Sequence, residues 1–392
     1  MSFGGFRLGK RSLFLLPLFL TLCASGGCKD TSWPIWQAYS NRFIDSQGRV
    51  FDPQGDQRTT SEGEAYALFF SLVADNRATF DRVLYWTQAN LAEGDLRQHL
   101  PVWLWGKGSD GQWKALDPNS ASDADVWMAY SLLEAGRLWK FRPYEVLGRS
   151  MMAQIAKAEV ANLPGFGPML LPGPVGFEHG QNWILNPSYV PLFIFDRFAE
   201  ADPAGPWRAI AARIPTLLQE SARHGYAMDW VQYVPGDGFY PASEQTPDHD
   251  KKTDDPGGSY DAIRVYLWAG MLAPGTPGRE QILNAVPAMG AYLAAHEFPP
   301  EKVGGDGIPV GQNGPVGFSA ALLPYLHALP GMSRASAQQM IRMAREKDPS
   351  TGLYGETPAY YNQNLALFGT GFMDRRFRFG TGGGLNVEWK LR

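Results

Sequence analysis

Three acidic residues lie where a polar segment meets an apolar one, and these residues are the best placed in the sequence to do chemistry. The first is Glu62, between a polar run and an apolar, aromatic segment that begins at residue 65. Ser61 and Glu64 have the spacing of a capping box, so we expect a helix to begin here. Glu62 then lies in the first turn of that helix, at the edge of the core that the helix enters.

The same arrangement recurs at two later positions. Asp123 follows Ser122, and Ser122 and Asp125 again have the spacing of a capping box, before a stripe of apolar residues at helical steps. Asp261 follows Ser259, the expected N-cap of a third apolar helix. The sequence therefore predicts three helices that each begin with an acidic residue.

Each of these acids also has a plain structural explanation. Acidic residues in first turns often do no more than complement the helix dipole, and this explanation covers Glu62. It covers Asp123 too, although two aspartates within three residues exceed what a cap needs. Asp261 is spaced to form an exposed i,i+3 ion pair with Arg264, which contributes about 0.2–0.5 kcal/mol. Taken one at a time, the three residues leave both explanations open.

The three acids would converge if their helices were arranged in a ring with the same ends at one face. A helix N-terminus stabilises a carboxylate, which suits a general base and works against a general acid. Glu62 would serve as an acid only if burial or a nearby carboxylate, for which Asp123 is the candidate, raised its pKa. Paired carboxylates among aromatic side chains are the usual equipment for hydrolysing glycosidic bonds.

Tryptophans in glycine- and proline-rich loops are the candidates for stacking on sugar rings, since their faces are large and apolar. Trp103, Trp105 and Trp183 lie in such loops, whereas Trp139 and Trp268 lie within expected helices. Core packing remains the alternative explanation for any single tryptophan. We therefore take Trp103, Trp105 and Trp183 as candidate substrate-binding residues.

Short helices separated by loops rich in Gly, Pro and Asp make up the rest of the chain. Because apolar residues recur at helical steps and period-2 alternation is scarce, we expect an all-α or mostly α domain. Expected helices cover residues 34–45, 62–75, 77–92, 123–140, 143–160, 187–199, 207–222, 260–272, 278–295, 317–328, 333–347 and 358–370. The expected long loops are 103–119 and 163–189, both aromatic, and 234–258, which we predict to be mobile.

Composition argues against several classes of function. With 35 Lys and Arg against 39 Asp and Glu, the net charge is −4, and no long basic run follows the N-terminal region, so nucleic acid is not an expected partner. The six histidines are scattered without metal-ligand spacing, so we expect no metal site. The sequence contains neither a Gly-x-Ser-x-Gly elbow nor a glycine-rich phosphate loop, and no cofactor is expected.

The N-terminus has the pattern of a signal peptide. Basic residues up to Arg11 precede an apolar run over 13–22, and small residues follow. That run is too short to span a bilayer comfortably. We therefore expect residues 1–28 to be a removable leader and residues 29–392 to form a single exported domain.

Both cysteines, Cys23 and Cys28, lie in this leader. A mature domain that begins near residue 28 would contain no disulfide, and its stability would come from packing. Residues 25–28 also resemble a lipoprotein cleavage site. Lipid anchoring through an acylated Cys28 is thus an alternative to complete release from the membrane.

Over residues 33–379 the chain resembles glycoside hydrolase family 8. The segment Ala121-Ser122-Asp123-Ala124-Asp125-Val126-Trp127-Met128-Ala129-Tyr130-Ser131-Leu132-Leu133-Glu134-Ala135-Gly136-Arg137-Leu138-Trp139 fits the signature of the family throughout. Further blocks match at residues 60–66, 185–189, 259–264 and 314–320, whereas residues 234–258 show little of the family pattern.

The resemblance implies an (α/α)6 barrel, with six inner and six outer helices around a cleft formed by long aromatic loops. It also implies inverting hydrolysis of β-1,4-glucan without a cofactor. By position Glu62 would be the proton donor and Asp261 the general base. Asp123 matches a residue described either as a nucleophile or as a residue that grips the sugar. We favour the second role, because inversion involves no covalent nucleophile. The implied substrate-binding partners are Tyr189, Tyr260 and Arg264.

Within the family, the chain looks like the periplasmic endo-β-1,4-glucanases encoded with bacterial cellulose synthases. This likeness implies a monomeric enzyme, periplasmic or secreted, that trims β-1,4-glucan during cellulose biosynthesis and associates transiently with the synthase or export complex. Two alternatives remain. The same fold could act on xylan, chitosan or mixed-linkage glucan, or the protein could be a glucan-binding scaffold without activity. The presence of all three acids argues against the scaffold.

Overall fold

The computed structural model describes residues 1–2, 32–242 and 256–391. Trp33–Arg392 form one compact unit, separate from Met1–Ser32. Nearly all of the predicted leader, including both cysteines, lies outside the described residues, as do residues 243–255 of the segment predicted to be mobile. Among the described residues, no helix has the length and apolar character needed to cross a bilayer.

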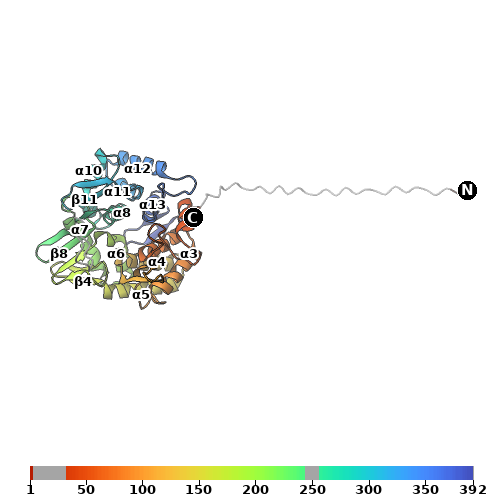
Figure 1. Ribbon diagram of the computed structural model, residues 1–392, viewed down its shortest axis with the longest axis horizontal. Helices are drawn as coiled ribbons and strands as arrows, with labels where there is room; N and C mark the ends of the chain where they lie inside the picture. Colours follow the sequence, from red (N-terminus) through yellow and green to blue (C-terminus); the bar gives the residue numbers. More distant parts are fainter. Residues whose placement is uncertain (3–31, 243–255, 392) are drawn as a thin grey trace. The chain divides into compact units, whose positions relative to one another are not determined.

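The α-helices of the described residues fall into two groups according to their burial. Six are buried along most of their length, as expected of helices with apolar residues on nearly every face. These are α2 (Ser61–Val73), α4 (Ser122–Leu138), α6 (Leu192–Ala201), α8 (Ala262–Met271), α11 (Val316–Ala328) and α13 (Tyr360–Met373). In Figure 1, α4, α6, α8, α11 and α13 lie toward the middle of the compact unit.

The remaining helices bury part of their surface and expose the rest to solvent. They are α1 (Pro34–Phe43), α3 (Arg77–Leu91), α5 (Arg142–Ala158), α7 (Trp207–Ser221), α9 (Arg279–Ala285), α10 (Pro287–Ala295) and α12 (Ser333–Glu346). Successive helices pack in pairs: α3 on α2, α5 on α4, α7 on α6, α9 on α8 and α12 on α11. The buried helices also pack on one another, α2 on α4, α4 on α6, α8 on α11 and α11 on α13.

The predicted helices are confirmed to within a few residues, with two exceptions. The expected helix over 278–295 is two helices, α9 and α10, because Pro287 has no amide hydrogen with which to continue α9. The expected helix over 187–199 begins with a 3-10 turn, Pro187–Tyr189, and α6 starts only after Pro191. The chain is mainly helical, as predicted.

Strands occupy much of the sequence that was predicted to be loop. The expectation of irregular loops over 103–119 and 163–189 is wrong, because both segments form antiparallel strands. β2 (Val102–Lys107) and β3 (Trp113–Ser120) form a hairpin, which β1 (Thr59–Thr60) extends. A four-stranded sheet contains β6 (Glu178–His179), β7 (Asn182–Leu185), β8 (Trp230–Val234) and β9 (Gly238–Ala242). Smaller sheets pair β4 (Val160–Leu163) with β5 (Gly167–Leu170), β10 (Gly257–Gly258) with β11 (Pro300–Gly304) and β12 (Pro309–Asn313), and β13 (Phe377–Phe379) with β14 (Leu385–Val387).

Aromatic side chains join the buried helices at the centre of the core. Trp127 of α4 lies 4.9 Å from Phe69 of α2 and 5.1 Å from Phe368 of α13, measured between ring centroids. Trp268 of α8 lies 5.1 Å from both Trp127 and Phe368. Ring pairs at such separations favour defined orientations. This cluster therefore fixes α2, α4 and α8, which carry the three candidate acids, relative to one another.

Candidate active site

Arg264 of α8 lies where the beginnings of three helices meet. Its Nη1 donates hydrogen bonds to Glu62 Oε2 at 2.5 Å and to Asp123 Oδ2 at 2.8 Å, and its Nη2 donates to Asp261 Oδ1 at 2.5 Å. The three acids come from the first turns of α2 and α4 and from the N-cap of α8. The structure thus gathers all three predicted acids around one guanidinium.

Exposure separates the members of this cluster. The side chain of Arg264 is 2% exposed and that of Asp123 is 5% exposed, so both lie below the surface. The side chains of Glu62 and Asp261 are 20% and 27% exposed. The ion pair between Asp261 and Arg264 exists, but it is not the exposed helical pair that the spacing allowed. Glu62 and Asp261 are therefore the two carboxyl groups of the cluster that are partly exposed.

The environment of Glu62 favours its protonated form. Burial raises the pKa of Glu62 to about 7, and the charges of Asp123 and Asp261 act in the same direction, while Arg264 opposes them. A carboxyl group with this pKa still carries a proton near neutral pH. The condition set for Glu62 to act as an acid is thus met, and Asp123 is one of its causes.

Asp123 is held by hydrogen bonds on both of its oxygens. Oδ2 accepts from Arg264, and Oδ1 accepts from the amide of Ala124 at 2.7 Å. Burial raises the pKa of Asp123, although Arg264 opposes this shift. A side chain so enclosed suits the positioning of neighbouring groups better than attack on a substrate.

The N-terminus of α2 differs from the predicted capping box. Thr60, not Ser61, is the N-cap, and its side chain accepts a hydrogen bond from the amide of Gly63 at 3.3 Å. Glu64 turns away and accepts from the amide of Val50 at 2.8 Å. The prediction was one residue out because Ser61 and Glu64 are both buried. Glu62 nevertheless lies in the first turn, as expected.

The predicted caps of α4 and α8 are also wrong. The hydroxyl of Ser122 caps no amide, and Asp125 is buried against Glu159 instead. Ser259 Oγ donates to the backbone oxygen of Glu301 at 2.6 Å, so it does not cap α8. Asp125 and Ser259 thus make contacts with distant parts of the chain in place of the local capping pattern.

Tyrosines surround the guanidinium. Arg264 Nη1 lies 3.1 Å from the hydroxyl of Tyr66, and the guanidinium lies 5.5 Å from the ring centroid of Tyr189. Tyr361 donates a hydrogen bond to the backbone oxygen of Tyr260 at 2.6 Å. Tyr189 and Arg264 are thus together, as the family resemblance implied, and Tyr260 is half exposed beside Asp261.

Two cavities border the cluster. One has a volume of about 520 Å³ and is lined by four aromatic side chains, Trp103, Phe177, Tyr189 and Trp230. The rings of Phe177 and Trp230 are parallel to within 1° at a centroid separation of 6.0 Å. The other cavity, of about 190 Å³, is lined by Glu62 together with Arg58, Thr60, Tyr360 and Tyr361. Aromatic surface therefore borders the cluster next to Tyr189, and polar surface borders it next to Glu62.

The three predicted tryptophans have different positions. Trp103 lines the larger cavity. Trp105 lines neither cavity and stacks on Trp113 at 5.0 Å, with the guanidinium of Arg49 over both rings. Irregular register around residue 104 reorients the side chains of β2, which is why Trp103 and Trp105 diverge. Trp183 is 6% exposed, packs against Tyr233 and lines neither cavity.

Four residues beside the cluster were not predicted: Phe177, Asp229, Trp230 and Tyr361. Phe177 and Trp230 lie in or next to segments whose strands were not expected, so their approach to the cleft had no sequence signal. Tyr361 lies in the first turn of a predicted helix, which was a usable signal. Asp229 bonds to α8 across more than 25 residues of chain, and no local pattern indicates such a contact.

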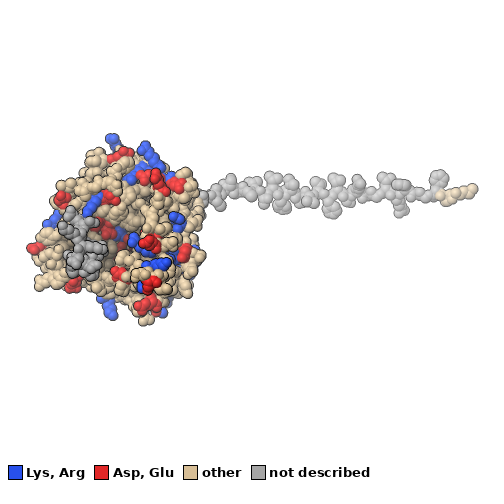
Figure 2. All heavy atoms as spheres, viewed as in Figure 1, with Lys and Arg blue, Asp and Glu red and all other residues tan. Residues whose placement is uncertain are grey.

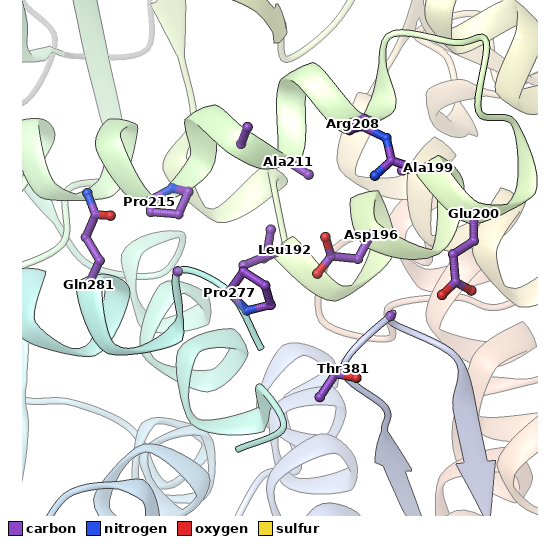
Figure 3. A pocket seen from close by; sticks show the side chains of 13 residues that line it. Leu192, Asp196, Ala199, Glu200, Arg208, Ala211, Pro215, Pro277, Gln281 and Thr381 are labelled. Atoms are coloured by element: carbon purple, nitrogen blue, oxygen red, sulfur yellow. The ribbon is translucent and has the colours of Figure 1, made fainter. Parts of the chain in front are cut away.

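A separate cavity of about 450 Å³ lies between α6, α7 and the turn before β14 (Figure 3). Asp196, Glu200 and Arg208 project from the two helices among Leu, Ala and Pro side chains. Its lining reaches the last turn of α6 and the segment after α8, whereas the acids lie at helix beginnings. Because the cavity has no aromatic lining residue, it does not resemble a sugar-binding cleft.

Metal-ligand groups and charged patches are further features that could mark a site in the described residues. No group of three His, Cys, Asp or Glu in the described part of the chain has a metal-binding arrangement. In Figure 2, acidic and basic side chains are interspersed over the visible face. The cluster around Arg264 consists of three carboxyl groups and one guanidinium, and carboxyl groups can transfer protons.

Comparisons with known proteins agree on one family. Residues 12–375 match the family described as glycosyl hydrolases family 8. An endoglucanase of Xanthomonas axonopodis pv. citri (strain 306) is 46% identical over 362 residues, which cover 91% of this chain and 90% of that protein. An endoglucanase of Escherichia coli (strain K12) is 42% identical over 384 residues, covering 98% and 97%. The crystal structure of an endo-1,4-D-glucanase from Vibrio fischeri ES114 superposes with a TM-score of 0.81 at 36% identity, covering 92% of this chain and 100% of that one.

Proposed function

The chain belongs to family 8 of the glycosyl hydrolases, and from this premise we propose that it is an endo-1,4-β-glucanase that hydrolyses β-1,4-glucan with inversion and without a cofactor. The observation that carries the proposal is the position of Glu62 and Asp261 on two nitrogens of one buried guanidinium. The two relatives described above are endoglucanases and match nearly the whole chain.

Glu62 acts as the general acid. Its raised pKa, about 7, keeps it protonated near neutral pH, so it can donate a proton to the glycosidic oxygen as the bond breaks. The leaving sugar then departs as a neutral alcohol. The buried Asp123 supports this role by its negative charge and by its hold on Arg264.

Asp261 acts as the general base. It takes a proton from a water molecule, which attacks the anomeric carbon from the face opposite to the leaving group. Inversion follows because a single displacement occurs and no residue forms a covalent intermediate. Arg264 holds both groups in place, since each carboxyl group bonds to a different terminal nitrogen of its guanidinium.

Cavities next to two different parts of the cluster support cleavage within a polymer. Trp103, Phe177 and Trp230 provide apolar surfaces for glucosyl rings on the side of Tyr189. Arg58, Thr60 and Tyr361 provide polar contacts on the side of Glu62. An endo-acting enzyme needs sites for sugar units on both sides of the bond that it cuts.

The proposal includes the arrangement of helices as an (α/α)6 barrel. Six mostly buried helices and their more exposed partners have the composition and the pairing that such a barrel requires. The beginnings of α2, α4 and α8 meet at Arg264, which fits a ring whose helix N-termini share one face.

Export and a link to cellulose secretion also belong to the proposal. The basic, apolar and small-residue pattern of residues 1–28 supports a signal peptide and a periplasmic or secreted enzyme, with lipid anchoring at Cys28 as the variant form. The resemblance to glucanases encoded with cellulose synthases supports trimming of β-1,4-glucan by a monomer that associates transiently with the export complex.

Comparison of polymers in one assay tests the activity. We expect hydrolysis of carboxymethylcellulose to exceed that of xylan, chitosan and mixed-linkage glucan, with viscosity falling before much reducing sugar appears. A preference for one of the other polymers would mean that this polymer, and not β-1,4-glucan, is the substrate. Binding of cello-oligosaccharides without turnover of any polymer would show that the protein is a glucan-binding scaffold and not an enzyme.

A further inference from the structure

Asp229 connects a distant segment to the helix that carries Asp261. It lies directly before β8, and its Oδ1 accepts three backbone hydrogen bonds. The donors are the amides of Ser259 at 2.8 Å, Asp261 at 3.0 Å and Ala262 at 2.7 Å. These amides lie at and just before the beginning of α8, where no intrahelical acceptor is available. One carboxylate oxygen from outside the helix thus caps α8.

The backbone around Asp229 is fixed against the same region. The amide of Asp229 donates to the oxygen of Gly257 at 2.8 Å, and the amide of Ala227 donates to the hydroxyl of Tyr266 at 2.9 Å. A Cβ on Gly258 would lie 2.0 Å from the oxygen of Ala227, so only glycine allows this approach. The segment is therefore attached to α8 at both its first and its second turn.

Asp261 has no cap of its own, and this makes the position of its carboxyl group dependent on Asp229. No side-chain cap from residue 261 satisfies the first amides of α8. The side chain of Asp261 instead reaches Arg264. If Asp229 lost its acceptor oxygen, three amides would lose their partner and the backbone that carries Asp261 could move.

We propose that Asp229 is a positioning residue for the general base, acting through the three amides that it holds at the beginning of α8. This inference depends on the proposed role of Asp261 and extends it to a residue outside the reacting groups. Asp229 does not exchange a proton with the substrate. It fixes the distance and direction from which Asp261 meets the attacking water, and displacements of about 1 Å can cost about a hundred-fold in rate.

The surroundings of Asp229 indicate that its acceptor oxygen matters more than its charge. Burial raises the pKa of Asp229 to about 7, and the charge of Asp261 adds to this effect, while the three amide bonds oppose it. A neutral side chain with an oxygen in the same place is therefore expected to replace it. Asparagine has that oxygen, and alanine does not.

The test compares three variants of the full chain on cellohexaose. For Asp229→Ala we expect kcat to fall about ten- to a hundred-fold with KM within about two-fold of wild type. For Asp229→Asn we expect kcat within about three-fold of wild type, because the amide oxygen restores the acceptor. The matched control is Asp237→Ala, which removes an exposed carboxyl group in the turn after β8 and should change neither constant. Thermal unfolding of each variant shows that it is folded.

A second substrate tells the base from the acid. Hydrolysis of β-cellobiosyl fluoride needs no protonation of the leaving group but still needs a base, so Asp229→Ala should lose a similar factor on the fluoride. If Asp229→Ala does not fold, Asp229→Glu serves in its place, since its displaced oxygen should also lower kcat and spare KM.

Two results would overturn the inference. One is a wild-type kcat for Asp229→Ala; the other is an Asp229→Asn variant as impaired as Asp229→Ala, which would mean that the acceptor oxygen is not what matters. Asp261→Asn separates this failure from failure of the proposed function. If Asp261→Asn is inactive while Asp229→Ala is normal, only the positioning role of Asp229 is disproved. If Asp261→Asn is active, Asp261 is not the general base.

Discussion

Glu62 and Asp261 bond to the same guanidinium, yet their surroundings differ, and the roles proposed for them follow from that difference. Glu62 lies beside Asp123, close to polar residues of the smaller cavity, and burial keeps it protonated to about pH 7. Asp261 is the N-cap residue of α8, bonds to the other terminal nitrogen of Arg264 and is more exposed than Glu62. Pairs of carboxyl groups in contrasting environments commonly divide the work of acid and base. The proposed division into acid and base follows from where Glu62 and Asp261 lie, since both side chains carry the same carboxyl group.

The pH dependence of kcat/KM tests the acid. Since Glu62 must be protonated to act and its pKa is about 7, the rate should fall as pH rises through about 7. The charge of Asp123 helps to raise this pKa, so Asp123→Asn should move the alkaline limb of the residual activity to lower pH, by about one unit. The measurement is kcat/KM on cellohexaose from pH 4 to about 9. An alkaline limb that stays in place, or moves to higher pH, would contradict this assignment.

Local patterns were enough to predict the three acids, but not their partners. Glu62, Asp123 and Asp261 stand at boundaries between polar and apolar sequence, which a single chain reveals. The three bonds from α8 to Asp229 join segments about thirty residues apart, and only the folded structure brings them together. Trp183 lies in a segment that was predicted to be a loop, but the structure places it in the strand β7, where it is buried.

At the scale of elements, the start of α2 decides where Glu62 points. Thr60 caps this helix, and Ser61, the cap predicted from the sequence, has a buried hydroxyl without a hydrogen-bond partner. Thr60→Ala should therefore lower the free energy of unfolding by about 0.5–2 kcal/mol. Ser61→Ala, its neighbour and matched control, should change it by less than about 0.5 kcal/mol. Urea unfolding of both variants measures the difference. A larger decrease in the free energy of unfolding for Ser61→Ala than for Thr60→Ala would mean that Ser61 is the cap after all.

The hairpin of β2 and β3 gives a second prediction at this scale. Trp103 lines the aromatic cavity, whereas Trp105, two residues later, stacks on Trp113 and Arg49. Trp103→Ala should raise KM for cellohexaose about ten-fold with little effect on kcat, because it removes a stacking surface remote from the bond. Trp105→Ala should leave KM nearly unchanged. Equal changes in KM for both variants would show that the cavity is not the binding surface.

The helices could be predicted because their periodicity lies within one segment of sequence. The strands could not, because a strand is defined by its pairing with another segment. Apolar residues at three- to four-residue steps marked most helices to within a few positions, and Pro287 explains the one that divides. β2 and β3 contain glycine, proline and charged residues, and their exposed positions break the alternation that marks a strand. β2 also pairs with β1, which lies directly before α2 and far from the hairpin along the chain.

At the scale of the whole molecule, buried carboxyl groups make stability depend on pH. Asp125 of α4 lies against Glu159 at the end of α5, and Ser120 donates a hydrogen bond to Glu159 at 2.5 Å. Burial raises the pKa of Glu159 to about 7, from a usual value of 4.5. The folded state therefore holds this proton more tightly than the unfolded state. Its contribution to stability is present below about pH 4.5 and is lost as pH rises toward about 7.

Thermal unfolding at two pH values tests this pair. The Tm of the wild-type protein should be lower at pH 8 than at pH 5, and Glu159→Gln should reduce the difference by about 2–4 °C. Glutamine keeps an oxygen that can accept from Ser120 and is uncharged at every pH, so it resembles the protonated acid. Glu145→Gln removes a half-exposed carboxyl group from the same helix and should leave the difference unchanged. A Glu159→Gln variant with the wild-type dependence on pH would show that Glu159 does not contribute to it.

Arg264 gathers an acid and a base for which we propose separate tasks, and a change of leaving group distinguishes the two. Fluoride leaves β-cellobiosyl fluoride without being protonated, but the reaction still needs an activated water. Glu62→Gln should lose about 10²–10⁴-fold in kcat on cellohexaose yet hydrolyse the fluoride within about ten-fold of the wild-type rate. Asp261→Asn should be inactive on both substrates, and NMR of the wild-type products should show the α-anomer first. A Glu62→Gln variant equally inactive on both, or a first product of β configuration, would contradict the account.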